Sequence, residues 1–302
     1  MAPTAVADII PTTLTSTSVL PAKEAAHVHG MEDKRPLEAI SHGDVVLPGI
    51  PTFPSFVEKR QWQLEHMAAA FRHWDREGFV LGISGHISVR DPEFTNCIWL
   101  NPLGKHFGLL NASDMILVSL DDGKVVRNNT NRPPNAAGFL IHAPIHRRRA
   151  DAHSVCHAHT KWGKAWSVFG KPLEMLSQDA CKFYNAHATY NQYGGVVLAE
   201  EEGERIADAL GDGKGAILRN HGLLTVGQTV DEAAFLFLSM EKACEGQILV
   251  EAAAANGHKK VLITDEEAEY NFKMESDFET CYAEFQAYYD YEDHHLKGEF
   301  KK

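Results

Sequence analysis

The sequence predicts a layered α/β domain, because short strand-like runs alternate with amphipathic helical runs along a single chain. Three observations support this fold class. Apolar residues recur at steps of three and four between 57 and 78, which indicates a helix. Short apolar runs bounded by turn residues follow between 83 and 120. Two Thr-x-x-Glu patterns, beginning at Thr229 and Thr264, are typical of helix starts in the last third of the chain.

The first 50 residues are expected to form a disordered arm. More than half of the 13 prolines lie before residue 55, among serines, threonines and other small residues. Such a segment buries too little apolar surface to offset the entropy that it loses on ordering. We therefore place the arm at 1–50, the main domain at 57–260, and a C-terminal helix and tail at 261–302.

The main domain is predicted to begin with a helix that ends at Gly78. Its apolar residues, Leu64, Met67, Phe71 and Trp74, share one face. Strands are expected at 83–90, 98–100, 115–120, 154–159 and 216–218, and helices after residue 135 and at about 200–210. Pro144 is expected to kink or shorten the first of these two helices.

The last third of the chain is predicted to be helical. One helix follows Thr229, and a second follows Thr264 and carries an apolar, largely aromatic stripe formed by Met274, Phe278, Tyr282, Phe285 and Tyr289. Such a stripe either packs on the core of its own chain or covers a neighbouring subunit. The segment 261–302 is therefore a candidate subunit interface.

The composition excludes several classes of protein. The 302 residues include 29 basic and 41 acidic side chains, for a net charge of −12, and such a surface repels phosphate backbones. The chain contains no apolar run of about 18 residues, which a membrane-spanning helix needs. Neither nucleic acid nor a membrane is expected as a partner. Five cysteines without a Cys-x-x-Cys pair, and no basic residue before Lys23, favour a reduced cytoplasmic protein.

The most informative stretch is 154–160, which contains His157 and His159. Residues two apart on a strand point to the same face, about 6.6 Å apart along the backbone. Two such imidazoles can reach one ion through bonds of about 2.0–2.1 Å. His221 follows a short apolar run and precedes a glycine, which allows a close backbone approach, so it is a plausible third ligand. Cys156 alternates with His157 and is expected to face away from the ion.

Other polar clusters have structural interpretations. A His-x-His pair alone is more often a hydrogen-bonded strand pair than a metal site. His142 and His146, one helical turn apart, could chelate an ion but are interpreted as a helix surface pair. The acidic run 200–202 is interpreted as a helix N-terminus that the macrodipole favours.

Four motifs occur in order along the chain: Gly85-His86-Ile87-Ser88-Val89-Arg90, Asn101-Pro102-Leu103-Gly104, His157-Ala158-His159 and Asn220-His221-Gly222. From about Trp62 to Gly246, the chain resembles the class II aldolase/adducin family in the order and spacing of these motifs. The resemblance implies a three-layer α/β/α sandwich with a mostly antiparallel central sheet. It also implies a divalent metal on His157, His159 and His221, and often a homotetramer with active sites between subunits.

The chain departs from the sugar-phosphate aldolases that it resembles. Those enzymes carry a Ser-Ser-Glu stretch, whose serines bind phosphate and whose glutamate transfers a proton. The aligned positions here are Ala136, Ala137 and Gly138, and His86 and Leu103 replace an asparagine and a threonine of the first two loops. Four donors to phosphate are absent, so an unphosphorylated substrate is expected.

The missing glutamate leaves the acid/base group open. Three neutral imidazoles would leave a bound cation with its full charge, and a water molecule bound to such a cation can have a pKa near 7 and serve as the base. Alternatively, His86, Tyr184 or a C-terminal tyrosine supplies the base. A third alternative is that no lyase chemistry remains.

The leading hypothesis is a metal-dependent, aldolase-like lyase acting at a carbon–carbon bond next to a carbonyl group in a small unphosphorylated substrate. The expected cofactor is a divalent metal, with Zn²⁺ first and Fe²⁺ or Mn²⁺ as alternatives, because imidazole binds all of these ions. A three-histidine Fe(II) oxygenase and a non-catalytic, adducin-like scaffold are the alternative functions.

Overall fold

The computed structural model describes residues 34–302, and its compact unit begins at Arg35. Within 1–50, which we expect to be a disordered arm, residues 1–33 lie outside the described part. The described remainder contains a short helix, α1 (Pro36–Ile40), whose Leu37 is buried. The expected disorder therefore does not extend through 36–40, because this helix contacts α7 and α8.

A single sheet of eight strands forms the centre of the described unit. Its strands are β1 (His86–Arg90), β2 (Cys97–Leu100), β3 (Ile116–Ser119), β4 (Val125–Arg127), β5 (Ser154–Ala158), β6 (His187–Tyr190), β7 (Gly215–Leu218) and β8 (Gly222–Gly227). They lie in the order β4-β3-β2-β1-β5-β8-β7-β6. Every neighbouring pair is antiparallel except β6 and β7, so the predicted mostly antiparallel sheet is confirmed.

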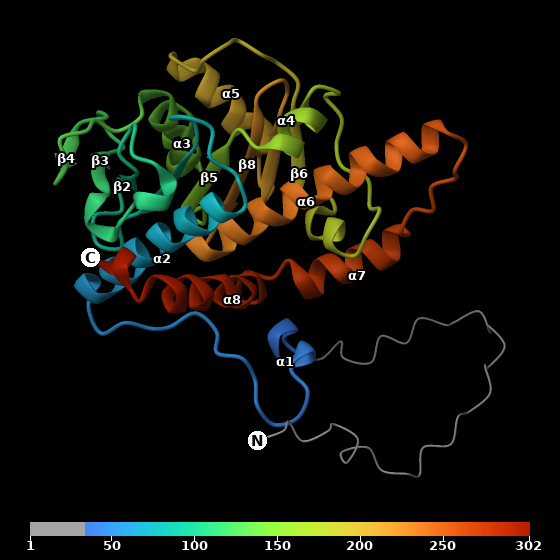
Figure 1. The fold of residues 1–302 in the computed structure, drawn as a ribbon, viewed down its shortest axis with the longest axis horizontal. Helices are drawn as coiled ribbons and strands as arrows, with labels where there is room; N and C mark the ends of the chain where they lie inside the picture. Colours follow the sequence, from blue (N-terminus) through green and yellow to red (C-terminus); the bar gives the residue numbers. More distant parts are fainter. Residues whose placement is uncertain (1–33) are drawn as a thin grey trace, which may run out of the picture. The chain divides into compact units, whose positions relative to one another are not determined.

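Helices cover both faces of this sheet (Figure 1). On one face lie α2 (Phe56–Arg76), α4 (Lys161–Ser167) and α6 (Val230–Ala255), whose apolar residues form the largest core cluster with β1, β5 and β8. On the other face lie α3 (Ala136–Arg148) and α5 (Glu200–Leu210), which bury a second cluster around Ile141 and Ile206. This arrangement is the three-layer α/β/α architecture that the resemblance implies.

The helices begin and end where the sequence indicates. Ser55 accepts a hydrogen bond from the backbone of Glu58 at the start of α2, and Gly78 follows its end with φ of +74°. Thr229 caps α6 in the same way. Pro144 lies inside α3 and does not shorten it, since the helix continues to Arg148.

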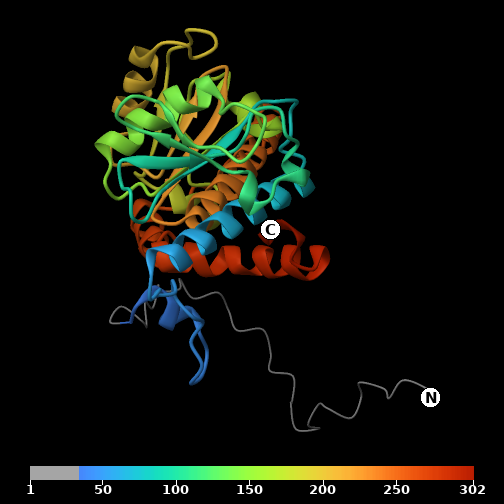
Figure 2. The ribbon, with the colours of Figure 1, turned by 90° about the vertical axis from the view of Figure 1, so that its left-hand side faces the viewer.

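The C-terminal segment forms two helices, α7 (Asp265–Glu275) and α8 (Phe278–Leu296), where the sequence predicts one. That prediction is wrong because Asp277 caps a new helix, accepting from the backbone of Glu279 and Thr280 at 3.1 Å. Helix α8 lies beside α2 (Figure 2) and contacts both α2 and α6. Its aromatic stripe therefore packs on its own chain. Phe285 is fully buried, and Tyr289 stacks on a histidine of α2 with ring centroids 3.9 Å apart.

Short 3-10 helices connect these elements: Phe107–Leu109, Ala112–Asp114, Asp179–Phe183 and Glu299–Lys301. All five cysteines are buried free thiols. Among the described residues, no helix combines the length and the apolar character that crossing a membrane requires.

Candidate metal centre

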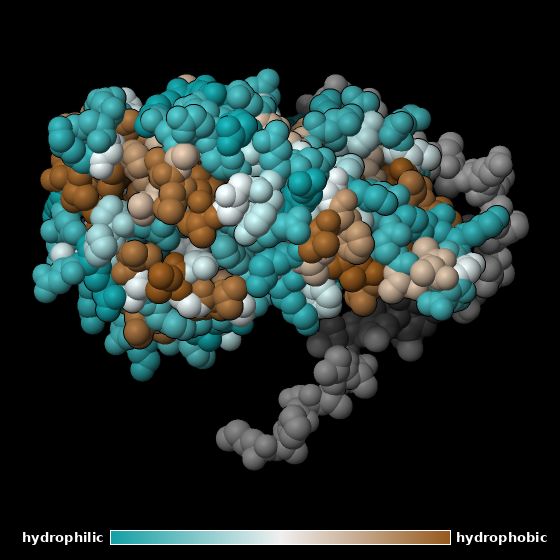
Figure 3. Space-filling view, turned by 90° about the horizontal axis from the view of Figure 1, so that it is seen from above, coloured by the Kyte–Doolittle hydropathy of each residue, from teal (hydrophilic) through white to brown (hydrophobic). Residues whose placement is uncertain are grey.

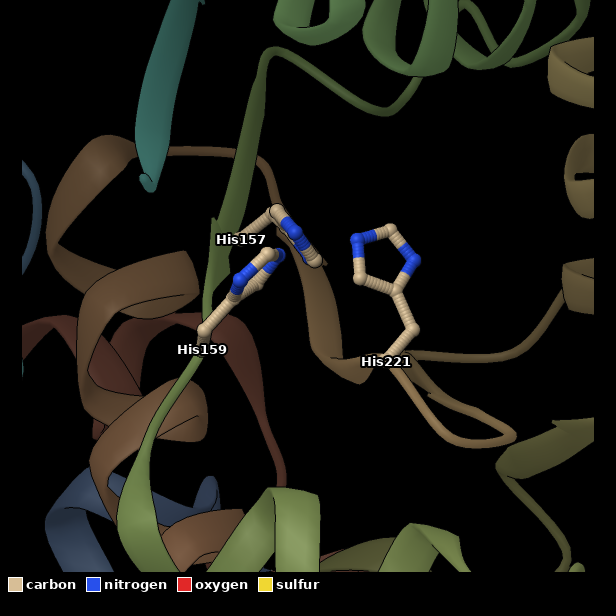
Figure 4. A group of neighbouring side chains, drawn as sticks. All are labelled: His157, His159 and His221. Carbon is tan, nitrogen blue, oxygen red and sulfur yellow. The ribbon is translucent and has the colours of Figure 1, made fainter. Parts of the chain in front are cut away.

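Three imidazoles meet where β5 ends beside the turn between β7 and β8. His157 lies on β5, His159 directly follows that strand, and His221 lies in the turn. Their ligand nitrogens all lie within 4.8 Å of one another, and their ring centroids are 4.7–5.1 Å apart. Figure 4 shows the three rings facing one another across a shared space. The structure therefore brings together the three residues that the sequence predicts as ligands.

The turn that carries His221 depends on two special backbone positions. Asn220 has φ of +59°, a left-handed conformation that asparagine tolerates better than most residues. The backbone N–H of His221 donates to the carbonyl of Leu218 at 3.0 Å, which closes the turn. Gly222 then approaches β5 so closely that a Cβ there would lie 2.6 Å from the carbonyl oxygen of Ala158. This close approach brings His221 toward His157 on β5 and His159 directly after it.

Gly222→Ala is expected to disturb both stability and metal binding. The added methyl group meets backbone, which cannot rotate away, so we expect a loss of about 1–3 kcal/mol in the free energy of unfolding. Urea unfolding and titration with Co²⁺ measure the two effects. Gly246→Ala is the matched control, because nothing lies within 4 Å of a Cβ on that helical glycine. Unchanged stability and metal affinity in Gly222→Ala would contradict this account of the turn.

The protonation of the three histidines fits a cation. Burial lowers the pKa of His157 well below its usual value, and the neighbouring His221 and His86 lower it further. Burial likewise lowers the pKa of His221 to about 4 and also lowers that of His159. All three rings are therefore neutral near pH 7, the state in which imidazole binds metals.

One of these rings also has its tautomer fixed. The Nδ1–H of His157 donates to the carbonyl of Leu223 at 2.8 Å, so Nε2 carries the free lone pair. Tetrahedral bonds of about 2.0–2.1 Å place ligand nitrogens roughly 3.4 Å apart. The three ligand nitrogens already lie within 4.8 Å of one another, and neutral imidazoles are ligands that divalent metals accept, so the residues present fit a divalent metal. Cys156 on the same strand belongs to the core cluster on the opposite face, as expected.

A buried carboxylate holds the segment that follows His159. Glu241 of α6 accepts hydrogen bonds from the Thr160 hydroxyl at 2.5 Å and from the backbone N–H groups of Trp162 and Gly163 at 2.8 and 2.7 Å. These groups form the first turn of α4, whose N–H groups would otherwise have no partner. Glu241 thus anchors the backbone directly beside His159.

The first turn of α3 lies close to His86. Ala136, Ala137 and Gly138, the positions at which the resemblance implies serines and a glutamate, form this turn. A Cβ on Gly138 would lie 2.7 Å from Cδ2 of His86, so the imidazole fills the space beside the glycine. The ring centroids of His86 and His157 are 4.9 Å apart.

The interpretation of His142 and His146 as a helix surface pair is wrong. Both are fully buried on the face of α3 that packs on β1. His142 lies 2.8 Å from Nδ1 of His86 and 2.7 Å from the hydroxyl of Ser88, which in turn lies 2.7 Å from His146. The spacing in the sequence is compatible with this cluster. His86 and Ser88 lie two residues apart on a strand and so share a face, and His142 and His146 lie one helical turn apart.

The acidic run 200–202 does begin α5, as predicted, but one of its members turns inward. Glu202 is largely buried and accepts a hydrogen bond from the hydroxyl of Tyr190 at 2.7 Å. It also pairs with Arg205. Its negative charge partly opposes the lowering of the His221 pKa by burial and by His159, which places this carboxylate near the third ligand. The charge pattern of the sequence did not reveal this inward orientation.

Tyr184, the other residue proposed as a base, lies at the end of the 3-10 helix Asp179–Phe183. Its hydroxyl interacts with Asp265 at the start of α7 and with Asn185. Burial and the charge of Asp265 raise its pKa. The structure thus brings His86 to the three histidines, and places the Tyr184 hydroxyl in a different polar contact.

Comparison with known proteins identifies relatives of this chain. Residues 65–248 match the model of the Class II Aldolase and Adducin N-terminal domain. The chain is 43% identical over 212 residues to Meiotically up-regulated gene 14 protein of Schizosaccharomyces pombe, covering 70% of this chain and 82% of the relative.

Two relatives from Streptomyces are each 41% identical over 212 residues, or 70% of this chain. They are Decarboxylase NovR of Streptomyces niveus, of which 78% is covered, and 4-hydroxy-3-prenylphenylpyruvate oxygenase/4-hydroxy-3-prenylbenzoate synthase of Streptomyces roseochromogenus, of which 76% is covered. Among solved structures, L-fuculose 1-phosphate aldolase from Glaciozyma antarctica superposes with a TM-score of 0.77 and 37% identity, covering 84% of this chain and 97% of that one. The chain therefore belongs to the class II aldolase/adducin family.

Proposed function

We propose that this protein is a divalent-metal-dependent lyase that breaks a carbon–carbon bond next to a carbonyl group in an unphosphorylated, carboxylate-bearing substrate. The observation that carries the proposal is the meeting of three neutral imidazoles beside a helix turn that lacks the serines of sugar-phosphate aldolases. A divalent cation held there supplies Lewis acidity to a carbonyl oxygen. Zn²⁺ is the first candidate, with Fe²⁺ and Mn²⁺ as alternatives.

The residues have separate roles in this proposal. His157, His159 and His221 hold the cation, and His86 faces the substrate from the neighbouring strand. Glu241 keeps His159 in place through the start of α4. Tyr184 has no role in this proposal, because its hydroxyl interacts with Asp265.

The preference for a carboxylate substrate rests on charge. Lys164 lies close enough to His159 to lower its pKa, after the larger effect of burial. Among the described side chains, no carboxylate lies within ion-pair distance of Lys164, although acidic groups outnumber basic ones in the chain. The name of one Streptomyces relative, a decarboxylase, also fits a substrate with a carboxylate, and the name of the other includes a phenylpyruvate, which carries a carboxylate next to a carbonyl. We expect Lys164 to pair with the substrate carboxylate.

An Fe(II) oxygenase is the second candidate. Imidazole ligands bind Fe²⁺ as well as Zn²⁺, and the name of the relative that is an oxygenase favours this candidate. Oxygen separates the two candidates, because a lyase needs none. An adducin-like scaffold would need neither metal nor turnover.

The test uses the full chain, stripped of metal with a chelator and reloaded with Zn²⁺, Mn²⁺ or Fe²⁺ in turn. A 4-hydroxy-2-oxo acid and oxaloacetate are supplied without oxygen, since aldol cleavage of the first and decarboxylation of the second both release pyruvate. The expected result is metal-dependent pyruvate release that His157→Ala abolishes, with no cleavage of fuculose 1-phosphate. Turnover of 4-hydroxyphenylpyruvate only with Fe²⁺ and oxygen would favour the oxygenase. Failure to bind any of the three metals would refute both enzyme candidates.

A homotetramer is the proposed assembly. Apolar residues are exposed in separate patches on the surface (Figure 3). Large exposed side chains also flank the candidate centre in sequence: Val168 and Phe169 follow α4, and Val196 and Leu198 precede α5. Exposed apolar patches are typical of subunit contacts. Light scattering of the purified chain tests this assembly.

A further inference from the structure

A continuous chain of buried polar side chains runs between β1 and α3, behind the candidate metal centre. It joins His86, His142, Ser88 and His146 through contacts of 2.8, 2.7 and 2.7 Å, and ends 2.9 Å from the carbonyl oxygen of Ala152. All four side chains are at most 3% exposed. Buried histidines can act as donors or acceptors at either nitrogen, so the direction of the chain has to be derived.

The carbonyl of Ala152 fixes that direction, because a carbonyl oxygen only accepts. The Nδ1 of His146 must therefore carry a proton. Burial, with Arg90 and His153 nearby, lowers the pKa of His146 to about 3, so the ring is neutral and its Nε2 is bare. A bare Nε2 requires the Ser88 hydroxyl to donate to it.

The remaining contacts follow in the same direction. Having donated its only proton, the Ser88 oxygen accepts from Nδ1–H of His142. Burial lowers the pKa of His142 well below its usual value, so this ring is also neutral and its Nε2 accepts from Nδ1–H of His86. His86 is itself only 3% exposed, and a neutral ring whose Nδ1–H is donated to His142 carries no proton on Nε2. The opposite direction would place two lone pairs, on His146 Nδ1 and the Ala152 carbonyl, against each other.

We propose that this chain of hydrogen bonds locks His86 in the tautomer with its proton on Nδ1, so that Nε2 accepts a hydrogen bond from a hydroxyl group of the substrate. The inference deepens the proposed function. Its statement about the substrate hydroxyl group rests on that function, whereas its statement about the tautomer of His86 does not. Ser88, His142 and His146 are positioning residues, and His86 contacts the substrate. This series of hydrogen bonds ends on the carbonyl oxygen of Ala152, which takes up no proton at neutral pH. It therefore fixes a tautomer and does not conduct protons to solvent.

The location of His86 supports this role. A Cβ at position 138 would lie 3.2 Å from Nε2 of His86, so the bare nitrogen is close to the first turn of α3. This is the turn where the resemblance implies a glutamate. His86 pairs directly with His157 across β1 and β5, which puts both side chains on the same face of the sheet. The histidine thus places an acceptor next to the turn from which the acidic side chain is missing.

Nitrogen-15 NMR of the metal-free full chain shows which nitrogen of His86 carries the proton, and it needs no substrate turnover. The His86 signals are assigned from the spectrum of His86→Asn. The expected wild-type result is a protonated Nδ1 and a bare Nε2 on His86. Ser88→Ala is expected to give a mixture of tautomers, and Ser88→Thr, which keeps the hydroxyl, to retain the single one. A wild-type spectrum with the proton on Nε2, or an unchanged tautomer in Ser88→Ala, would overturn the inference.

Kinetics of the metal-loaded protein test whether Nε2 of His86 accepts a hydrogen bond from a hydroxyl group of the substrate. Ser88→Ala is expected to raise KM for the 4-hydroxy-2-oxo acid in inverse proportion to the fraction of protein that keeps the proton on Nδ1 of His86, about twofold for an equal mixture of the two tautomers. It should leave KM for oxaloacetate, which lacks that hydroxyl in its keto form, nearly unchanged. Ser154→Ala is the matched control, since Ser154 is a buried serine on the adjacent strand whose hydroxyl donates to the backbone carbonyl of Ser88 at 3.0 Å and contacts neither His142 nor His146 in the hydrogen-bond chain. Equal KM changes for both substrates would overturn the role toward the hydroxyl group. The expected NMR result without turnover of any substrate would instead refute the proposed function.

Discussion

His157→Ala is expected to lose divalent-metal binding and, with it, all metal-dependent turnover. His157 is the most buried of the three ligands, and its Nδ1–H contact with Leu223 fixes the nitrogen that faces the ion. Losing a partner that merely orients a ligand typically weakens metal affinity 10–100-fold, so losing the ligand itself should cost more than about a hundredfold. Isothermal titration with Zn²⁺ measures the affinity directly.

The control for this variant is a histidine outside the site. His258 is exposed in the segment after α6, and His258→Ala should bind metal like the wild type. Circular dichroism shows whether both variants keep the fold. Stoichiometric Zn²⁺ binding by a folded His157→Ala variant, with wild-type affinity, would show that the three imidazoles do not form the site.

Glu241→Ala is expected to weaken both the fold and the metal centre. Its carboxylate is almost fully buried and accepts from three donors at the start of α4. Removing it leaves those donors without partners in the interior, which should lower the free energy of unfolding by about 2–4 kcal/mol. Because the same turn follows His159, we also expect metal affinity to fall by about tenfold. Chemical denaturation and Zn²⁺ titration provide the two measurements.

Two further variants define the cause. Glu241→Gln keeps one acceptor oxygen at nearly the same position, so its losses should be smaller. Glu245→Ala removes a partly exposed carboxylate from the same helix and should change neither quantity appreciably. A Glu241→Ala variant that is destabilised but binds Zn²⁺ normally would show that the buried carboxylate supports the helix and not the ligand.

The sequence predicted those parts of the molecule that follow from local periodicity. Alternation on a strand identified His157 and His159, and a glycine after a short apolar run identified His221. The capping pattern at Thr229 marked the start of α6 correctly. In each case the signal lies within a few neighbouring residues.

The parts that the sequence did not predict depend on contacts between distant segments. The His142–Ser88 hydrogen bond joins residues 54 positions apart, and only the packing of α3 on β1 turns His142 inward. The strands β4, β6 and β8, the helix α4 and the break at Asp277 were also missed. A capping aspartate inside a continuous apolar stripe is a weak signal, because the stripe itself favours one long helix.

The outermost strand β4 has a consequence for how the protein behaves at high concentration. It carries two exposed valines, Val125 and Val126, at an end of the sheet where unpaired backbone groups could recruit another polypeptide. The strand is only three residues long, a bulge disrupts its pairing with β3, and Lys124 and Arg127 flank the valines. Short, irregular and positively charged edge strands are poor templates for fibril growth, so we expect this edge of the sheet to resist pairing with another polypeptide.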